Sequence, residues 1–173
     1  SDPLHYVNAD FPLLAAGVEI GVRREWRQGF MLQASYEFQH TAYLASTSAS
    51  DLLALRKNAD VRNVENSPDH LATLKAAAPI LARNLTLATR VTFEGPRYDR
   101  YESVTDPAQG RTVSAVLWDL VLSGHEDRWG LRYSLGAYNV ADNRYSLPVS
   151  NEFSQRAIVQ NGRTFLASLD ARF

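Results

Sequence analysis

Thr164-Phe165-Leu166-Ala167-Ser168-Leu169-Asp170-Ala171-Arg172-Phe173 is the stretch that decides the fold class of this chain. Its apolar side chains recur at every second position, and polar ones lie between them except at Leu166. Successive side chains of a β-strand point to opposite faces, so this alternation indicates a strand with one apolar and one polar face. The apolar set is Phe165, Ala167, Leu169, Ala171 and Phe173.

The same period of two recurs along the rest of the chain. Including the last strand, we count seven such runs, which we expect to form strands of ~9–13 residues, longer than the ~5–6 residues of an ordinary globular strand and suited to a tilted membrane strand. This pattern predicts an all-β, antiparallel fold. Periodicity alone leaves a soluble β-sandwich open as an alternative. The upstream runs are 18–27, 30–39, 72–80, 85–94, 116–122 and 131–137.

The connections between these runs alternate strictly between short and long. Residues 27–29, 82–83 and 125–129 form short connections, and residues 45–69, 96–111 and 143–162 form long ones. Outer-membrane barrels have short periplasmic turns and long extracellular loops. A Greek-key sandwich gives no reason for sorting loops by end, so we favour a transmembrane β-barrel.

Charged residues in the middle of several runs support the same interpretation. A dry sandwich core does not tolerate unpaired charges, whereas the wet interior of a barrel does. These residues are Glu19, Arg23, Glu37, Arg90, Asp119 and Asp170.

Composition excludes several other classes of protein. The 173 residues contain 18 Lys+Arg, 19 Asp+Glu and no cysteine, so we expect no nucleic-acid partner, disulfide or thiolate metal site. Mean hydropathy is −0.28. The longest apolar stretch, residues 11–18, is shorter than the ~18 residues of a spanning helix. The first residues lack the basic region and apolar core of a signal peptide.

Six segments carry a resemblance to a known family. The last strand, with its terminal Phe173, resembles the carboxyl-terminal strand of bacterial outer-membrane proteins. The other segments resemble, in order, motifs of TonB-dependent receptors, although Val140-Ala141 stands where that family usually has Leu-Phe. They are Ala16-Gly17-Val18-Glu19, Asn66-Ser67-Pro68-Asp69-His70, Phe93-Glu94-Gly95-Pro96-Arg97-Tyr98, Tyr138-Asn139-Val140-Ala141-Asp142-Asn143-Arg144-Tyr145 and Gln160-Asn161-Gly162-Arg163-Thr164-Phe165.

This resemblance implies that residues 1–173 are the carboxyl-terminal part of a ~22-stranded barrel, contributing seven strands and a partial eighth in 4–8. The plug domain, the TonB box and the earlier strands are not present in the sequence. The implied function is energy-coupled uptake of a scarce solute, such as a siderophore, another metal chelate or a carbohydrate, across the bacterial outer membrane. The implied partners are outer-membrane lipids, the rest of the barrel and plug, TonB through that plug, and the barrel-assembly machinery, which would read Phe165, Ala167, Leu169, Ala171 and Phe173.

Two alternatives remain open at this point. Eight strands suffice to close a small barrel, which would serve as an anchor or adhesin. An outer-membrane enzyme is the other alternative, but no Gly-x-Ser-x-Gly elbow accompanies the serines of the chain. We therefore expect no catalytic residue.

Candidate binding residues cluster in one predicted outer loop. Arg97 and Arg100, with Tyr98 and Tyr101, could hold an anionic solute or lipopolysaccharide phosphates. The four histidines lie far apart in the sequence, so we expect no metal site and no cofactor.

Overall fold

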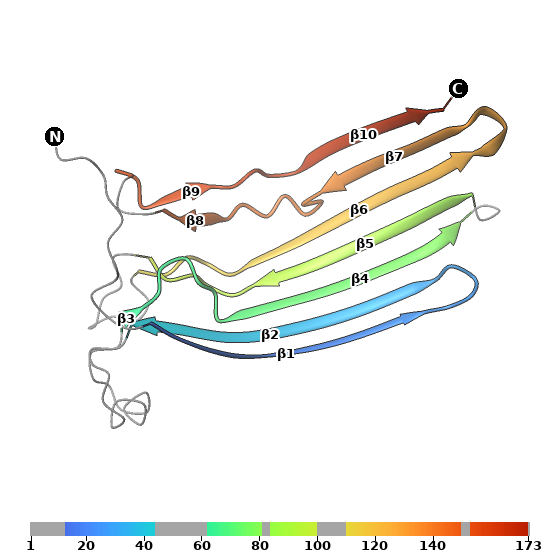
Figure 1. Cartoon of the computed structure of the whole chain (residues 1–173). Coiled ribbons are helices and arrows are strands. Elements are labelled where there is room, and N and C mark those ends of the chain that lie inside the picture. Colours follow the sequence, from blue (N-terminus) through green and yellow to red (C-terminus); the bar gives the residue numbers. More distant parts are fainter. Residues whose placement is uncertain (1–12, 44–61, 81–83, 100–109, 150–152, 173) are drawn as a thin grey trace.

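The computed structural model describes residues 13–43, 62–80, 84–99, 110–149 and 153–172. Its main feature is one curved antiparallel sheet with the strand order β1-β2-β4-β5-β6-β7-β10 (Figure 1). The short strand β3 pairs with β2, and β8 and β9 form a separate ribbon. The strands are β1 (Leu13–Glu25), β2 (Met31–Tyr43), β3 (Arg62–Asn63), β4 (His70–Ile80), β5 (Leu85–Glu94), β6 (Ala115–Glu126), β7 (Leu131–Tyr138), β8 (Ser146–Pro148), β9 (Ala157–Val159) and β10 (Thr164–Ala171).

All seven predicted runs are strands of this sheet, which confirms the all-β prediction. Two lengths differ from expectation, because β7 and β10 have only 8 residues each. Strand β1 begins earlier than predicted, at Leu13. The partial strand predicted in 4–8 lies outside the described residues.

Strand register sorts the side chains of the whole sheet onto two chemically different faces. Val18 pairs with Phe38, which pairs with His70, and Leu74 pairs with both Ala34 and Val91. This row of mostly apolar side chains continues through Trp118 on β6. It forms what we call the apolar face, and the polar face carries the alternate residues.

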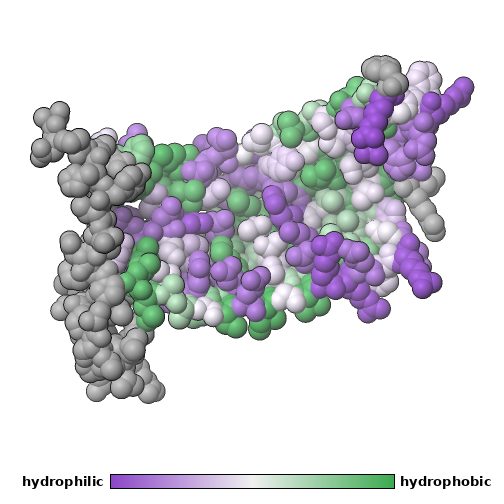
Figure 2. Space-filling view, in the orientation of Figure 1, coloured by the Kyte–Doolittle hydropathy of each residue, from purple (hydrophilic) through white to green (hydrophobic). Residues whose placement is uncertain are grey.

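The polar face collects the mid-strand charges that the sequence analysis singled out. Glu19 pairs with Glu37, and Lys75 pairs with Arg90, which in turn pairs with Asp119. Figure 2 shows hydrophilic side chains over the middle and the right-hand end of the sheet, with hydrophobic ones along its lower edge. The period-two pattern of the sequence is therefore realised across the sheet.

The apolar face is exposed, which inverts the arrangement of a soluble sheet. Along β2 the apolar residues Leu32, Tyr36 and Phe38 are exposed, while Gln33 and Glu37 opposite them are partly buried. The only buried hydrophobic residues within the described ranges are Ala42, Tyr98 and Ala115, which is far too few to form the core of a sandwich. Large exposed apolar surfaces mark contact with another apolar phase or partner.

Connections of different length lie at opposite ends of the sheet, as predicted. Figure 1 shows the β1–β2 and β6–β7 turns, with the end of β4 and the start of β5, at the right-hand end, and β3 with the β8–β9 ribbon at the left-hand end. The β6–β7 turn is a 3-10 turn, Asp127–Trp129, that closes on Gly130 in the left-handed conformation. The long connection 143–162 differs from a plain loop because it contains the β8–β9 ribbon.

The sheet is open within the described strands. Its edges are β1 and β10, and they do not pair with each other. Each edge therefore leaves a row of backbone groups available for pairing. No helix in the part of the chain that the structure describes is long and apolar enough to span a membrane.

Candidate functional site

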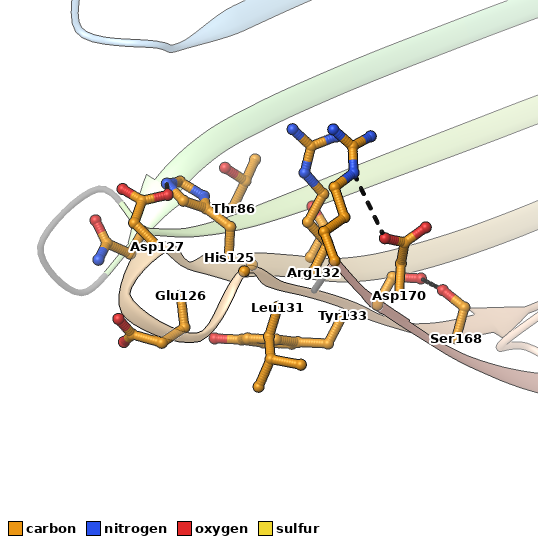
Figure 3. A pocket seen from close by; sticks show the side chains of 15 residues that line it. Thr86, His125, Glu126, Asp127, Leu131, Arg132, Tyr133, Ser168 and Asp170 are labelled. Carbon is orange, nitrogen blue, oxygen red and sulfur yellow. Dashed lines mark hydrogen bonds and ion pairs between the residues drawn. The ribbon is translucent and has the colours of Figure 1, made fainter.

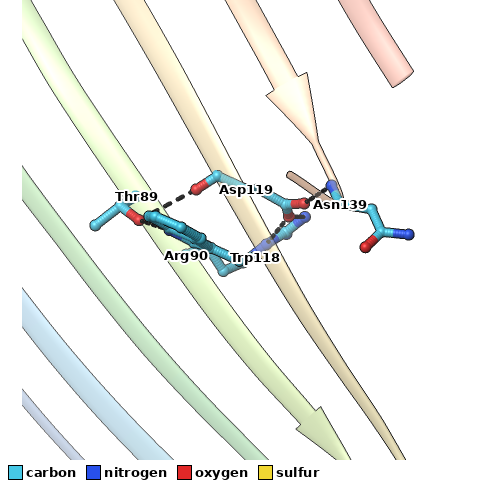
Figure 4. A network of polar contacts seen from close by, with 5 residues as sticks. All are labelled: Thr89, Arg90, Trp118, Asp119 and Asn139. Carbon is cyan, nitrogen blue, oxygen red and sulfur yellow. Dashed lines mark hydrogen bonds and ion pairs between the residues drawn. The ribbon is translucent and has the colours of Figure 1, made fainter. Parts of the chain in front are cut away.

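An ion pair lies at the centre of the polar face. Arg90 donates to Asp119 Oδ2 from Nε at 2.9 Å and from Nη2 at 2.6 Å (Figure 4). The Asp119 side chain is only 11% exposed, and its Oδ1 accepts the backbone N–H of Asn139 at 2.9 Å. Three donors therefore satisfy one buried carboxylate, as a charged group at this depth requires.

A network of hydrogen bonds links this ion pair to the segment that follows β7. Asn139 Nδ2 donates to the carbonyl of Asn143, and the N–H of Asn143 donates back to Asn139 Oδ1, both at 2.9 Å. Asp142 Oδ1 accepts the N–H of Arg163 at 2.8 Å, just before β10. The segments 138–145 and 160–165, which carry the family resemblance, thus meet in space and serve to end one strand and start another.

A pocket of about 760 Å³ lies next to this network, at the end of the sheet with the long connections, and we call it the long-connection pocket. It is lined by the segment 110–113 and by the start of the β8–β9 ribbon. Its three arginines are Arg111, Arg144 and Arg156. Arg156 Nη2 donates to Asp99 Oδ2 at 2.8 Å, and the guanidinium of Arg111 lies 4.3 Å from the Tyr98 ring centroid. Arg144 has no ion-pair partner among the residues that the structure describes.

Tyr145, which also lines the pocket, has a raised phenolic pKa. Burial of the hydroxyl is the main cause, and the negative charges of Glu94 and Asp119 add to it, while Arg97 acts in the opposite sense. A phenol that keeps its proton is a hydrogen-bond donor. The pocket therefore combines one neutral donor with three cations and one paired carboxylate, which suits a polar solute with anionic groups.

Two of the predicted binding residues, Arg97 and Tyr98, form hydrogen bonds within the protein. Arg97 donates to Glu94 Oε2 at 2.7 Å and to the carbonyl of Asn66 at 2.9 Å. Tyr98 is buried, and its hydroxyl donates to Asp69 Oδ2 at 3.2 Å. The other two predicted residues, Arg100 and Tyr101, lie outside the described residues.

The opposite end of the sheet has a second polar pocket, of about 610 Å³. Figure 3 shows His125, Arg132 and Asp170 on one side of the β6–β7 hairpin, and Leu131 and Tyr133 on the other. Ser134 and Ser168 are hydrogen-bonded at 2.7 Å across β7 and β10. Within the described ranges, no three His, Asp or Glu side chains come close enough to hold a metal ion.

The carboxyl-terminal strand has the predicted alternation. Phe165, Ala167, Leu169 and Ala171 pair in register with β7 and lie on the apolar face, where Phe165 is 72% exposed. Phe173 lies outside the described residues.

Sequence reasoning missed the residues that line the long-connection pocket. Arg144 stands inside a family-like motif and Arg156 inside a long connection, where single arginines carry no sequence signal. Only the folding of the β8–β9 ribbon places them beside Asp99 and Arg111.

Comparison with known proteins identifies the fold. No family profile matches the chain, and no curated protein matches it by sequence. The structure resembles the crystal structure of the ferric yersiniabactin uptake receptor FyuA from Yersinia pestis, with a TM-score of 0.67 and 20% identity. The match covers 93% of this chain and 24% of the receptor, so the chain spans about a quarter of that protein's length. The chain thus has the fold of a segment of that β-barrel protein, in agreement with the barrel fold that its resemblance to TonB-dependent receptors implied.

Proposed function

We propose that this chain forms the carboxyl-terminal barrel segment of a TonB-dependent outer-membrane receptor that takes up a scarce solute. The observation that carries the proposal is the inverted sheet, with an exposed apolar face and a charged, partly buried polar face. In a membrane the apolar face would contact lipid and the polar face would line a wet lumen. The remaining strands of the receptor would pair with the edges β1 and β10.

The open sheet favours this proposal over a small self-closed barrel. Every backbone group at membrane depth must be hydrogen-bonded, so a complete barrel cannot leave two unpaired edges in lipid. Strands β1 and β10 remain unpaired with each other here. The match to one quarter of a larger receptor agrees with a need for further strands.

The solute contact that we propose is the long-connection pocket. Its cations Arg111, Arg144 and Arg156 would attract carboxylate, catecholate or phosphate groups of a metal chelate or an acidic carbohydrate. The plug would complete this site from the lumen and would couple it to TonB. The barrel-assembly machinery would insert the chain into the bacterial outer membrane.

Topology provides the direct test. These 173 residues contain no cysteine, so a cysteine introduced here is the single thiol of this segment, and the full-length receptor without an introduced cysteine gives the background labelling. We expect a membrane-impermeant maleimide to label cysteines at positions 48, 106 and 152 on intact cells, and to spare those at 28 and 83. Labelling of the second set alone would invert the barrel. Equal labelling of both sets in a soluble fraction would refute membrane insertion.

A further inference from the structure

A groove on the apolar face stands apart from the sites described above. It has a volume of about 460 Å³ and is lined almost entirely by apolar atoms. It lies beside the β1–β2 turn, at the end of the sheet with the short connections. Its walls and floor are formed mainly by Trp26, Phe30, Leu32, Ala76, Ala78 and Leu87.

Strand register explains why the surface is hollow at this place. Strand β4 presents only the methyl groups of Ala76 and Ala78 here. Ala76 pairs with Leu32 on β2, and Ala78 pairs with Leu87 on β5. Two rows of large side chains therefore border a row of small ones, and the space between them follows the strand direction. This shape suits a straight hydrocarbon chain.

The groove also has a cation at its border. Arg24 belongs to the apolar face and pairs with Leu32, which lines the groove. Its guanidinium lies 5.0 Å from the ring centroid of Trp26, another lining residue. Arg24 is the only Lys, Arg, Asp or Glu on the apolar faces of β1 and β2. It has no carboxylate partner within the described ranges, whereas its neighbour Arg23 pairs with Glu25.

We propose that this groove binds one glycerophospholipid with an anionic headgroup, with an acyl chain over Ala76 and Ala78 and the phosphate beside Arg24. The inference rests on the proposed membrane insertion and goes beyond it by naming a site and a ligand. Short turns lie on the periplasmic side of outer-membrane barrels, so the groove faces the leaflet made of glycerophospholipids. Trp26 lies at the depth where aromatic rings meet headgroups.

The test uses the full-length receptor that contains this chain, purified in detergent and mixed with dipalmitoyl phosphatidylglycerol or dipalmitoyl phosphatidylcholine, whose acyl chains are saturated. Native mass spectrometry counts the lipids retained by each barrel. We expect one tightly retained phosphatidylglycerol, lost in Ala76→Leu/Ala78→Leu because leucine side chains would fill the groove. Ala34→Leu, on the same face but outside the lining, should keep it.

A second variant changes the charge at the border of the groove without altering the packing of the sheet. Arg24→Gln changes an exposed side chain, and we expect it to lower the preference for phosphatidylglycerol over phosphatidylcholine about fivefold. An unchanged preference, or wild-type retention in the filled variant, would overturn the lipid site. Retention of lipopolysaccharide or of a second receptor copy would also overturn it. A receptor that inserts normally but retains no lipid refutes only this site, whereas one found outside the membrane refutes the proposed function as well.

Discussion

Tyr133 covers Gly124 across the β6–β7 pair. The two residues are register partners on the apolar face, and a Cβ added to Gly124 would lie 2.5 Å from the Tyr133 phenolic oxygen. The absence of a side chain at Gly124 therefore lets an aromatic ring lie flat against the backbone. This contact secures the hairpin that the short 3-10 turn closes.

We expect Gly124→Val to displace the Tyr133 ring and to destabilise the barrel by about 1–3 kcal/mol, the usual cost of overpacking. Urea unfolding of the full-length receptor in detergent measures the loss. Gly21→Val is the matched control, because a Cβ there meets nothing closer than 3.9 Å. Adding Tyr133→Ala to Gly124→Val should restore part of the stability. Equal effects of both glycine variants would show that backbone entropy, and not the ring, matters.

The two faces of β4 give a sharp test of membrane insertion. Leu74 is 48% exposed on the apolar face, and its neighbour Thr73 lies on the polar face. On a water-exposed sheet Leu74→Arg would change the folding free energy little. At the bilayer midplane we expect it to destabilise the folded barrel by about 2–4 kcal/mol. Thr73→Arg should be tolerated because the polar face would line the lumen of the proposed barrel. Folding yield into lipid vesicles measures both, and similar yields would contradict the assignment of the faces.

The ion pair on the polar face should contribute to stability as well. Asp119→Asn removes the charge that accepts two Arg90 donors, and we expect a loss of about 2 kcal/mol, typical of hydrogen bonds to charged groups. A double-mutant cycle with Arg90→Gln isolates the pair. Strict additivity of the two single changes would show that the pair itself contributes nothing.

The long-connection pocket predicts the effect of one cation on solute binding. Arg144→Gln should weaken binding of an anionic metal chelate about tenfold, equivalent to about 1.4 kcal/mol. Radiolabelled-chelate binding to intact cells measures the loss. Arg163→Gln is the control, since Arg163 is exposed and does not line the pocket. Equal binding by the Arg144 variant and the wild type would place the solute elsewhere.

The carboxyl-terminal signature predicts an effect on assembly. Deleting Phe173 should lower the amount of receptor inserted while leaving synthesis unchanged. In an ordinary globular domain, removal of a frayed terminal residue matters little. Quantitative blotting of outer-membrane and total fractions checks this, with Asp106→Lys in a predicted outer loop as the control. Normal insertion of the deletion variant would mean that the signature is coincidental.

The sequence by itself determined the strands and their faces. Period-two alternation in Phe165–Ala171 and in 18–27 is a local property, because side chains of a strand alternate whatever the partner strand is. Loop length likewise predicted which ends of the strands lie together. These features also carried the family resemblance.

Only the tertiary structure decided what the polar residues do. Arg97 and Tyr98 appeared free to bind a solute, but Glu94 and Asp69 engage them once β4 and β5 pair. Arg144 and Arg156 were inconspicuous until the β8–β9 ribbon brought them to one pocket. The lipid groove arises in the same way, because its alanines border larger side chains only across three paired strands. Contacts between residues distant in sequence depend on which residues are paired across neighbouring strands, whereas the alternating pattern determines only the face on which each side chain lies.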